Sequence, residues 1–239
     1  MLIDDIHKAI EDKAKKSGKV EEIVVGLSYT GVKLENGCGV AYTLREGTCC
    51  FVENAGSLAE KSVTELAKLA MAPEPVKASI GVATINALID VEDYETGSPL
   101  DYIEITKNDV VGMVGFFAPL IKEIREKAKQ LYIFERKEIE GAYPDWAIYK
   151  LLPECDIVIV TGVAVINKTI DMILNLAKSA KEVCVLGAST PLLFEVFKKY
   201  GVTMLGGIKI VNPKQVMRII KEGGGIRNFG SAVEKIIIR

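Results

Sequence analysis

Glycine and hydroxyl residues recur at the ends of short apolar runs in the second half of this chain. Gly112 stands at the centre of the first run. The residues at the predicted strand ends, where the next helix begins, are Gly115 and Phe116; Glu135 and Arg136; Thr161 and Gly162; Gly187, Ser189 and Thr190; Gly206 and Gly207. Glycine allows a ligand to approach the backbone closely, and free N–H groups at the start of a helix attract anions. The repetition predicts a cofactor-binding site for a nucleotide-like or phosphorylated small molecule. Ser189-Thr190-Pro191 also fits an ordinary helix N-cap followed by proline.

Glu135 stands at the position of an acidic residue that binds ribose. In nucleotide-binding sheets, an acidic residue at the tip of the second strand, roughly 20 residues after the first glycines, binds a ribose hydroxyl. The segment Gly112-Met113-Val114-Gly115 lacks the third glycine of G-x-G-x-x-G, which favours a mononucleotide-like site over a tight dinucleotide grip. Arg136 would meet a phosphate or a carboxylate. The alternative is a surface ion pair between Glu135 and Arg136.

Polar residues elsewhere are candidates to complete the site. Thr30 and Asn86 are predicted substrate contacts, and Asn86 needs a partner because it lies on an otherwise apolar helix. A structural capping or bridging role is the alternative for Asn86. Lys33 and Glu35 lie near a predicted hairpin and are candidate catalytic proton-transfer groups. Asn167 follows the third strand of the second half and is predicted to cap the next helix or, as the alternative, to contact the cofactor.

The elements that must position these residues fall into two groups. The first half predicts a helix over residues 2–17 and then a three-stranded antiparallel meander over residues 20–52, with Asn36-Gly37 as a hairpin turn. The predicted turn Arg45-Glu46-Gly47 leads into the last piece of this meander, Thr48 to Val52. Two helices follow, over residues 57–69 and 75–89, and the polar segment 92–108 is interpreted as a linker.

After that segment, strands and helices alternate strictly. Strands are predicted at residues 110–115, 131–134, 156–160, 183–186 and 202–205, with helices between them and a last helix from Pro213 to Glu222. This alternation is typical of a parallel sheet with right-handed crossovers. The fold class is therefore α/β, with an α+β domain over residues 1–105 and a Rossmann-like domain over residues 106–239.

Composition excludes several classes of function. The chain has 239 residues, of which 49% are hydrophobic and 26% charged, with a net charge of −2. A sizeable core is expected, and no basic patch indicates nucleic acid as a partner. No apolar segment reaches the roughly 18 residues of a membrane span, and the N-terminus does not resemble a secretory signal, so a cytoplasmic location is predicted.

Histidine and cysteine limit the possible chemistry. His7 is the only histidine, so acid-base chemistry elsewhere must use other side chains or the substrate. The five cysteines, Cys38, Cys49, Cys50, Cys155 and Cys184, fit no C-x-x-C zinc spacing. Cys155 and Cys184 are expected in the core, and a soft-metal role for the vicinal pair Cys49-Cys50 is the alternative to an ordinary strand position.

With these residues in place, the sequence resembles the prokaryotic heavy-metal chelatase family. The segments that carry the resemblance are GLSYTGVKL, GCGVAYTL and INAL in the first half, and VGMVGFF, FER, LLPECDIVIVTG with Asn167, LGASTP and LGG in the second. The resemblance implies a domain like the N-terminal capping domain of enolases, fused to a Rossmann-like domain, with a site in the cleft between them. It also implies a function linked to heavy-metal chelation.

Three functions are compatible with these observations. The first is a ligand-processing protein whose interdomain cleft binds the small molecule. The second is a non-catalytic binder of a metal or metal complex, which would use Cys38, Cys49 or Cys50, or carboxylates such as Glu35 and Glu53. The third is a nucleotide-sensing module in a homo-oligomer, because sensing and catalysis share the same binding residues.

Overall fold

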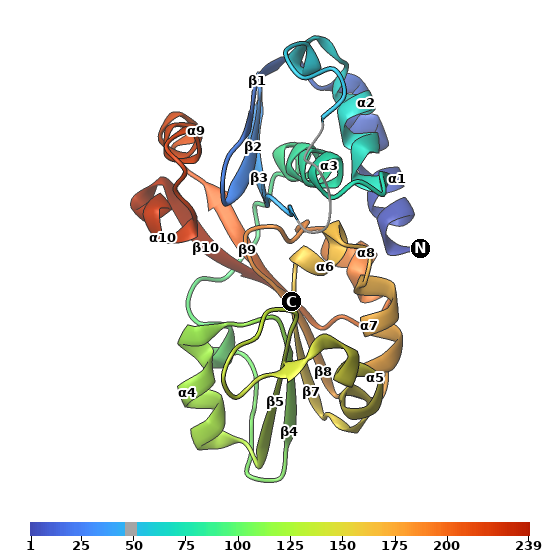
Figure 1. Ribbon diagram of the computed structural model, residues 1–239, viewed down its shortest axis with the longest axis vertical. Helices are drawn as coiled ribbons and strands as arrows, with labels where there is room; N and C mark the ends of the chain where they lie inside the picture. The colour runs from blue at the N-terminus through green and yellow to red at the C-terminus, as the bar shows by residue number, and fades with distance from the viewer. Residues whose placement is uncertain (46–51) are drawn as a thin grey trace.

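The computed structural model describes residues 1–45 and 52–239. The first group of elements forms a three-stranded antiparallel sheet with helices (Figure 1). Its members are α1 (Leu2–Lys16), β1 (Val20–Val25), β2 (Tyr29–Leu34), β3 (Gly37–Tyr42), α2 (Val63–Lys68) and α3 (Pro75–Leu88). The predicted turn at Arg45-Glu46-Gly47, the strand residues 48–51 and the pair Cys49-Cys50 lie wholly or partly outside the described residues.

The second group forms a seven-stranded sheet with helices on both faces (Figure 1). Its strands are β4 (Val110–Val114), β5 (Gln130–Glu135), β6 (Tyr143–Pro144), β7 (Ile157–Thr161), β8 (Glu182–Leu186), β9 (Met204–Ile210) and β10 (Val233–Ile238). Its helices are α4 (Ala118–Lys127), α5 (Ile148–Leu151), α6 (Val163–Ile166), α7 (Ile170–Leu176), α8 (Phe194–Lys198), α9 (Pro213–Lys221) and α10 (Ile226–Phe229). The predicted α/β fold class is confirmed.

The strand order of the larger sheet is β10-β9-β8-β7-β4-β5-β6. From β4 the chain moves outward to β5, and it then crosses back to β7 on the other side of β4. The order therefore reverses between β4 and β7, and α4 covers one face of the sheet while α5 and α7 cover the other (Figure 1). The sheet is parallel except at one edge, where β10, a strand that was not predicted, pairs antiparallel with β9.

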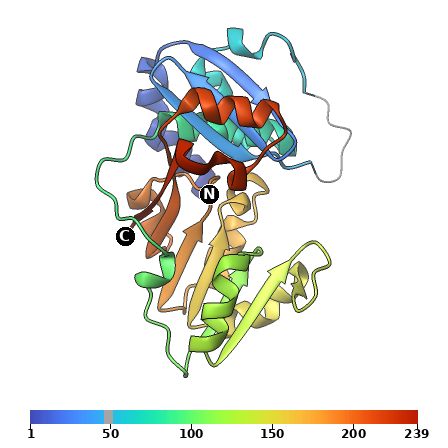
Figure 2. The ribbon, with the colours of Figure 1, turned by 90° about the vertical axis from the view of Figure 1, so that its left-hand side faces the viewer.

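The β2–β3 hairpin is packed on both faces, and glycines allow it. Gly37 pairs with Leu34, so the turn consists of Glu35 and Asn36, one residue earlier than predicted. A Cβ atom at Gly37 would lie 2.1 Å from the carbonyl oxygen of Ala87 in α3. On the other face, a Cβ atom at Gly31 would lie 2.7 Å from the sulfur of Met217 in α9. The small sheet is thus enclosed between α3 and α9, which are more than a hundred residues apart in sequence (Figure 2).

One hydrophobic core continues from the first group of elements into the second. The same buried cluster contains Ile6 of α1, Ile80 of α3, Val160 of β7 and Ile173 of α7.

Side chains cap the starts of two helices. The Ser62 hydroxyl of α2 accepts a hydrogen bond from the Glu65 amide at 3.2 Å, and the Asn212 side chain of α9 accepts one from the Gln215 amide at 3.1 Å. The division into domains at residue 105 stays a prediction.

Gly39→Ala should destabilise the chain. Its Cβ atom would lie 2.2 Å from both the Ala83 carbonyl oxygen and the Ala87 amide nitrogen, so β3 and α3 must separate. Overpacking of this kind costs about 1–3 kcal/mol of unfolding free energy, measurable by chemical denaturation. The control is Gly201→Ala, where the new methyl group meets no atom within 4 Å and only the positive φ of +83° opposes it. Equal stability of Gly39→Ala and the wild type would contradict this account of the packing.

Candidate functional site

Two cavities lie where the small sheet meets the larger one. The first cavity, of about 420 Å³, is lined by the β2–β3 turn, the end of α3, the loop after β8 and part of β9. The second cavity, of about 540 Å³, is lined by the ends of β4, β5 and β7, by the loops that follow them, and by Tyr42 and Leu44 after β3. The sequence predicts a single cleft. Some of its predicted residues line the first cavity and some the second, whereas the others line neither.

The second cavity lies at the carboxyl ends of three parallel strands. The predicted residues that line it are Gly115, Phe116, Glu135, Arg136, Thr161 and Asn167. Gly115 has a φ of +96° and ends β4 in a turn that a residue with a side chain would enter only under strain. A Cβ atom at Gly115 would lie 3.0 Å from the Cβ atom of Thr161, so the ends of β4 and β7 are in close contact here.

Glu135 and Arg136 carry opposite charges at the rim of the second cavity. The Oε1 atom of Glu135 accepts hydrogen bonds from the backbone N–H groups of Arg136, at 2.8 Å, and Lys137, at 3.4 Å. Oε2 makes no hydrogen bond with any described residue and is available to a ligand hydroxyl. Arg136 forms an ion pair with Asp145, at 3.4 Å between Nε and Oδ2.

Asn167 has a clear structural role. Its Oδ1 atom accepts hydrogen bonds from the backbone N–H of Thr169 at 3.1 Å and from the Thr169 hydroxyl at 2.7 Å. These bonds close a local turn between α6 and α7, in which Asn167 ends α6 and Thr169 is the N-cap residue of α7, so Asn167 is not the helix N-cap that the sequence predicted. Because Asn167 also lines the second cavity, this turn holds one part of the cavity wall in place.

Lys168, next to Asn167, was not predicted as a notable residue. Its φ is +66°, and its ammonium group donates hydrogen bonds to the carbonyl oxygens of Ala70 and, at 3.0 Å, Ile166. Burial lowers the pKa of this amine to about 8. Lys168 thus connects the helices of the first group to the wall of the second cavity. Sequence reasoning had no signal for it, because the contact with Ala70 joins residues distant in the chain.

The first cavity contains Lys33, Glu35, Asn86 and Thr190 of the predicted set. Lys33 forms an ion pair with Glu21, and this hydrogen bond raises the pKa of the lysine. A raised pKa keeps Lys33 protonated at neutral pH and makes it a poor proton acceptor. The Nδ2 atom of Asn86 donates to the carbonyl oxygen of Val40 at 2.9 Å, while its buried Oδ1 atom has no partner among the described residues. The buried Thr190 hydroxyl also has no hydrogen-bond partner among the described residues.

Ser189 and Thr30 are structural rather than exposed to a cavity. The Ser189 hydroxyl accepts a hydrogen bond at 2.8 Å from the backbone N–H of Tyr42, which joins the loop after β8 to the end of β3. The hydroxyls of Thr30 and Thr43 lie 3.0 Å apart, and both side chains are buried. Thr30 therefore faces Thr43 instead of a substrate.

The glycines of the predicted set have packing roles. Gly112 lies inside β4, as predicted, and a Cβ atom there would be 2.9 Å from the sulfur of Cys155. Gly206 and Gly207 are likewise inside β9, which continues to Ile210 and does not end at them as predicted. Two other predicted glycines adjoin the loop after β8.

Gly162 and Gly187 are the two predicted glycines next to the loop after β8. A Cβ atom at Gly162 would lie 2.5 Å from the Thr190 hydroxyl oxygen, which explains the glycine as a close approach. Gly187 has a φ of +117°, and its carbonyl oxygen accepts a hydrogen bond from the Thr190 amide at 3.0 Å. The tight turn after β8 depends on this conformation.

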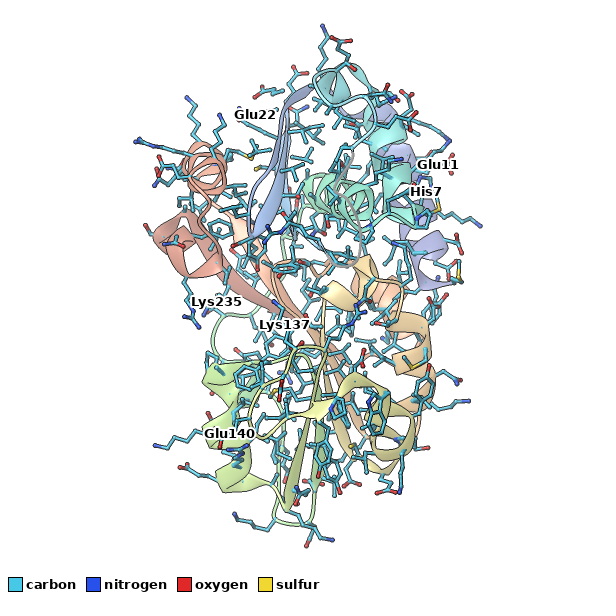
Figure 3. The ribbon with its side chains drawn as sticks, viewed as in Figure 1. His7, Glu11, Glu22, Lys137, Glu140 and Lys235 are labelled. Carbon is cyan, nitrogen blue, oxygen red and sulfur yellow. The ribbon has the colours of Figure 1, made fainter. Side chains whose placement is uncertain are left out.

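The described side chains do not form a metal site. Within residues 1–45 and 52–239, no three His, Cys, Asp or Glu side chains are grouped so that they could hold a metal ion. Burial raises the pKa of the Cys38 thiol to about 12, so the thiolate that a soft metal requires is disfavoured. Cys155 and Cys184 are buried as predicted, and burial also raises their pKa values to about 12. His7 lies on α1, well separated from Lys137 beside the second cavity in the view of Figure 3.

Comparisons with known proteins identify the family of this α/β chain. A family model, DUF364, with the description "Putative heavy-metal chelation", matches residues 98–239, and a second model with the same description, DUF4213, matches residues 7–89. The chain belongs to the DUF364 family. In the part of the chain that the structure describes, no helix has both the length and the apolar character needed to cross a membrane.

Relatives extend over the whole chain. An uncharacterized protein of Methanocaldococcus jannaschii is 28% identical over 98% of this chain and 96% of its own length. A crystal structure of a family member of unknown function from Pyrococcus horikoshii is 29% identical, with a TM-score of 0.88 over 100% of this chain and 99% of the other. Another, from Desulfitobacterium hafniense, is 25% identical, with a TM-score of 0.82 over 97% and 98% of the two chains. The resemblance inferred from sequence is confirmed.

Ser189→Ala should lower stability by about 1–3 kcal/mol, because the Tyr42 N–H loses its acceptor in a partly buried position. The measurement is the denaturant midpoint. The control is Ser57→Ala, which removes a hydroxyl bonded to the Asn54 carbonyl oxygen at 3.2 Å in an exposed turn and should change little. Equal midpoints for the two variants would show that the Ser189–Tyr42 contact does not hold the sheets together.

Lys168 should make stability depend on pH in the alkaline range. Between a folded pKa of about 8 and an unfolded value of 10.5, the unfolded chain binds a proton that the folded chain has released. The contribution of Lys168 to stability therefore rises with pH through this window and is lost as pH falls through 8. The measurement is the free energy of unfolding of the wild type minus that of Lys168→Met at several pH values. A difference that stays flat, as for a control change at exposed Lys178, would contradict the burial of the charge.

Proposed function

We propose that this protein binds a nucleotide-like or phosphorylated small molecule in the second cavity. One observation carries the proposal: the cavity lies outside the carboxyl ends of β4, β5 and β7, where the strand order reverses. Open α/β sheets bind their ligands at such a reversal, because the connections leave β4 and β7 toward opposite faces and open a crevice between them. Gly115 and Thr161 stand at the two sides of this crevice.

Each wall of the cavity has a role in the proposal. Glu135 accepts ligand hydroxyls through Oε2, since its other carboxylate oxygen is held by two backbone N–H groups. The glycine at 115 lets the ligand approach the end of β4 closely. Lys137, exposed in the loop after β5, favours an anionic group on the ligand (Figure 3). Tyr42 and Leu44 close the cavity from the side of the small sheet.

The proposed activity is binding of a small molecule. A link to chelation would come from the small molecule, whose own atoms would hold the metal. The grouping of described donors does not fit a protein-held metal, so we infer that any metal handled here is held by atoms of the small molecule. A non-catalytic carrier of such a metal complex is the second candidate function, and the description of the family favours it. The homo-oligomer and the cytoplasmic location stay predictions from the sequence.

Glu135→Ala should weaken binding without unfolding the chain. The loss of charge-assisted hydrogen bonds worth about 1.5–3 kcal/mol lowers affinity roughly 10- to 100-fold. Isothermal titration calorimetry with NAD and with ATP measures the change. The matched control is Glu140→Ala, which removes an exposed carboxylate from the same loop (Figure 3). Unchanged affinity in a folded Glu135→Ala variant would remove Glu135 from the site.

A further inference from the structure

Three aromatic side chains at the second cavity are exposed. Phe116 is 41% exposed, Trp146 72% and Tyr149 63%, and all three line the cavity. Trp146 is the only tryptophan of the chain. Large aromatic side chains gain about the most from burial, so their joint exposure around one cavity indicates a surface that a ligand covers.

Buried neighbouring residues fix the positions of Trp146 and Tyr149. Trp146 lies in the 3₁₀ turn Asp145–Ala147, and Tyr149 lies in α5, which follows without a break. Residues three apart on a helical segment share a face. The adjacent side chains of Ala147, Ile148 and Leu152 are buried and anchor the segment to the core. Trp146 and Tyr149 are therefore held at the cavity by their neighbours, and the fold of the segment does not depend on the burial of their rings.

The rings narrow the chemistry of the ligand more than the charges beside them do. Aromatic side chains stack on flat conjugated rings, and they also attract cations. The cavity is lined by two cationic side chains, Lys137 and Arg136, and by two anionic ones, Glu135 and Asp145, of which Arg136 and Asp145 form an ion pair. These opposite charges balance, so a neutral flat ring can stack on the aromatic side chains without a net charge opposing it.

We propose that Trp146, which lines the second cavity together with Tyr149 and Phe116, stacks on a flat conjugated ring of the ligand, so that the ligand is of the nucleoside class and not a sugar phosphate. The ring lies against Trp146 and the sugar hydroxyls reach Glu135. This inference rests on the proposed function, because it names the class of molecule that the second cavity binds.

Intrinsic fluorescence tests the inference directly, since all tryptophan emission comes from Trp146. Adenosine 5′-monophosphate and NAD should quench or shift the emission of the wild type in a saturable way, whereas ribose 5-phosphate, which lacks the ring, should not. By calorimetry, Trp146→Ala should lower the affinity for both nucleotides about 5- to 150-fold, the range that corresponds to one base stacked on one ring. Trp146→Phe should retain most of it.

The matched control is Tyr143→Ala, which removes an aromatic side chain that is also exposed, at 42%, but does not line the second cavity. Nucleotide binding that depends on Glu135 but is unchanged in Trp146→Ala would overturn the stacking inference and leave the proposed function standing. No binding of any of the three probes would overturn both. Emission that changes with protein concentration alone, together with a dimer lost in Trp146→Ala, would assign the rings to self-association and also overturn the inference.

Discussion

The burial of the β2–β3 hairpin between α3 and α9 is the constraint on which the remaining structure depends. Close approach on both faces requires residues without side chains, at Gly37 and Gly39 toward α3 and at Gly31 toward α9. Because α9 comes from the end of the chain, the small sheet is completed only when the C-terminal segment has folded onto it (Figure 2). The hydrophobic core that runs from α1 to α7 follows from the same arrangement. The two groups of elements therefore stabilise each other.

This constraint also sets the geometry of the cavities. With the hairpin fixed, the end of β3 is held against the loop after β8 by the hydrogen bond between the Tyr42 amide and the Ser189 hydroxyl. Residues on either side of Ser189 line the first cavity, and Tyr42 lines the second. The contact between the sheets therefore lies between two separate spaces. Only the second of them lies at the reversal of strand order, with Glu135 and the exposed rings at its rim.

Much of the fold could be predicted from the sequence, because strand and helix periodicities are local. The positions of β4, β5, β7 and β8 were predicted to within a residue or two at each end. The apolar run Ile236–Ile238 was a signal for β10 that the prediction did not use. The division of the site was beyond local reasoning, since Ser189 and Tyr42 are 147 residues apart. Gly37 and Gly206 were assigned to a turn and to a strand end, whereas their positions reflect neighbours that only the tertiary structure supplies. Trp146 and Tyr149 were not singled out from the sequence, since exposure cannot be read from spacing alone.

The central claim is that the second cavity binds a nucleotide-like molecule through its own residues and needs no metal held by the protein. The most direct measurement is a thermal-shift screen of the whole chain against NAD, NADP, S-adenosylmethionine, ATP, sugar phosphates and divalent metals, each alone. A ligand at about 100 times its dissociation constant adds roughly 2.7 kcal/mol to the free energy of unfolding, a shift that is readily detected. The account predicts that at least one nucleotide raises the melting temperature and that Glu135→Ala reduces this shift by about half or more at the same ligand concentration. A rise with metals alone, lost when cysteines are replaced by serine, would contradict it.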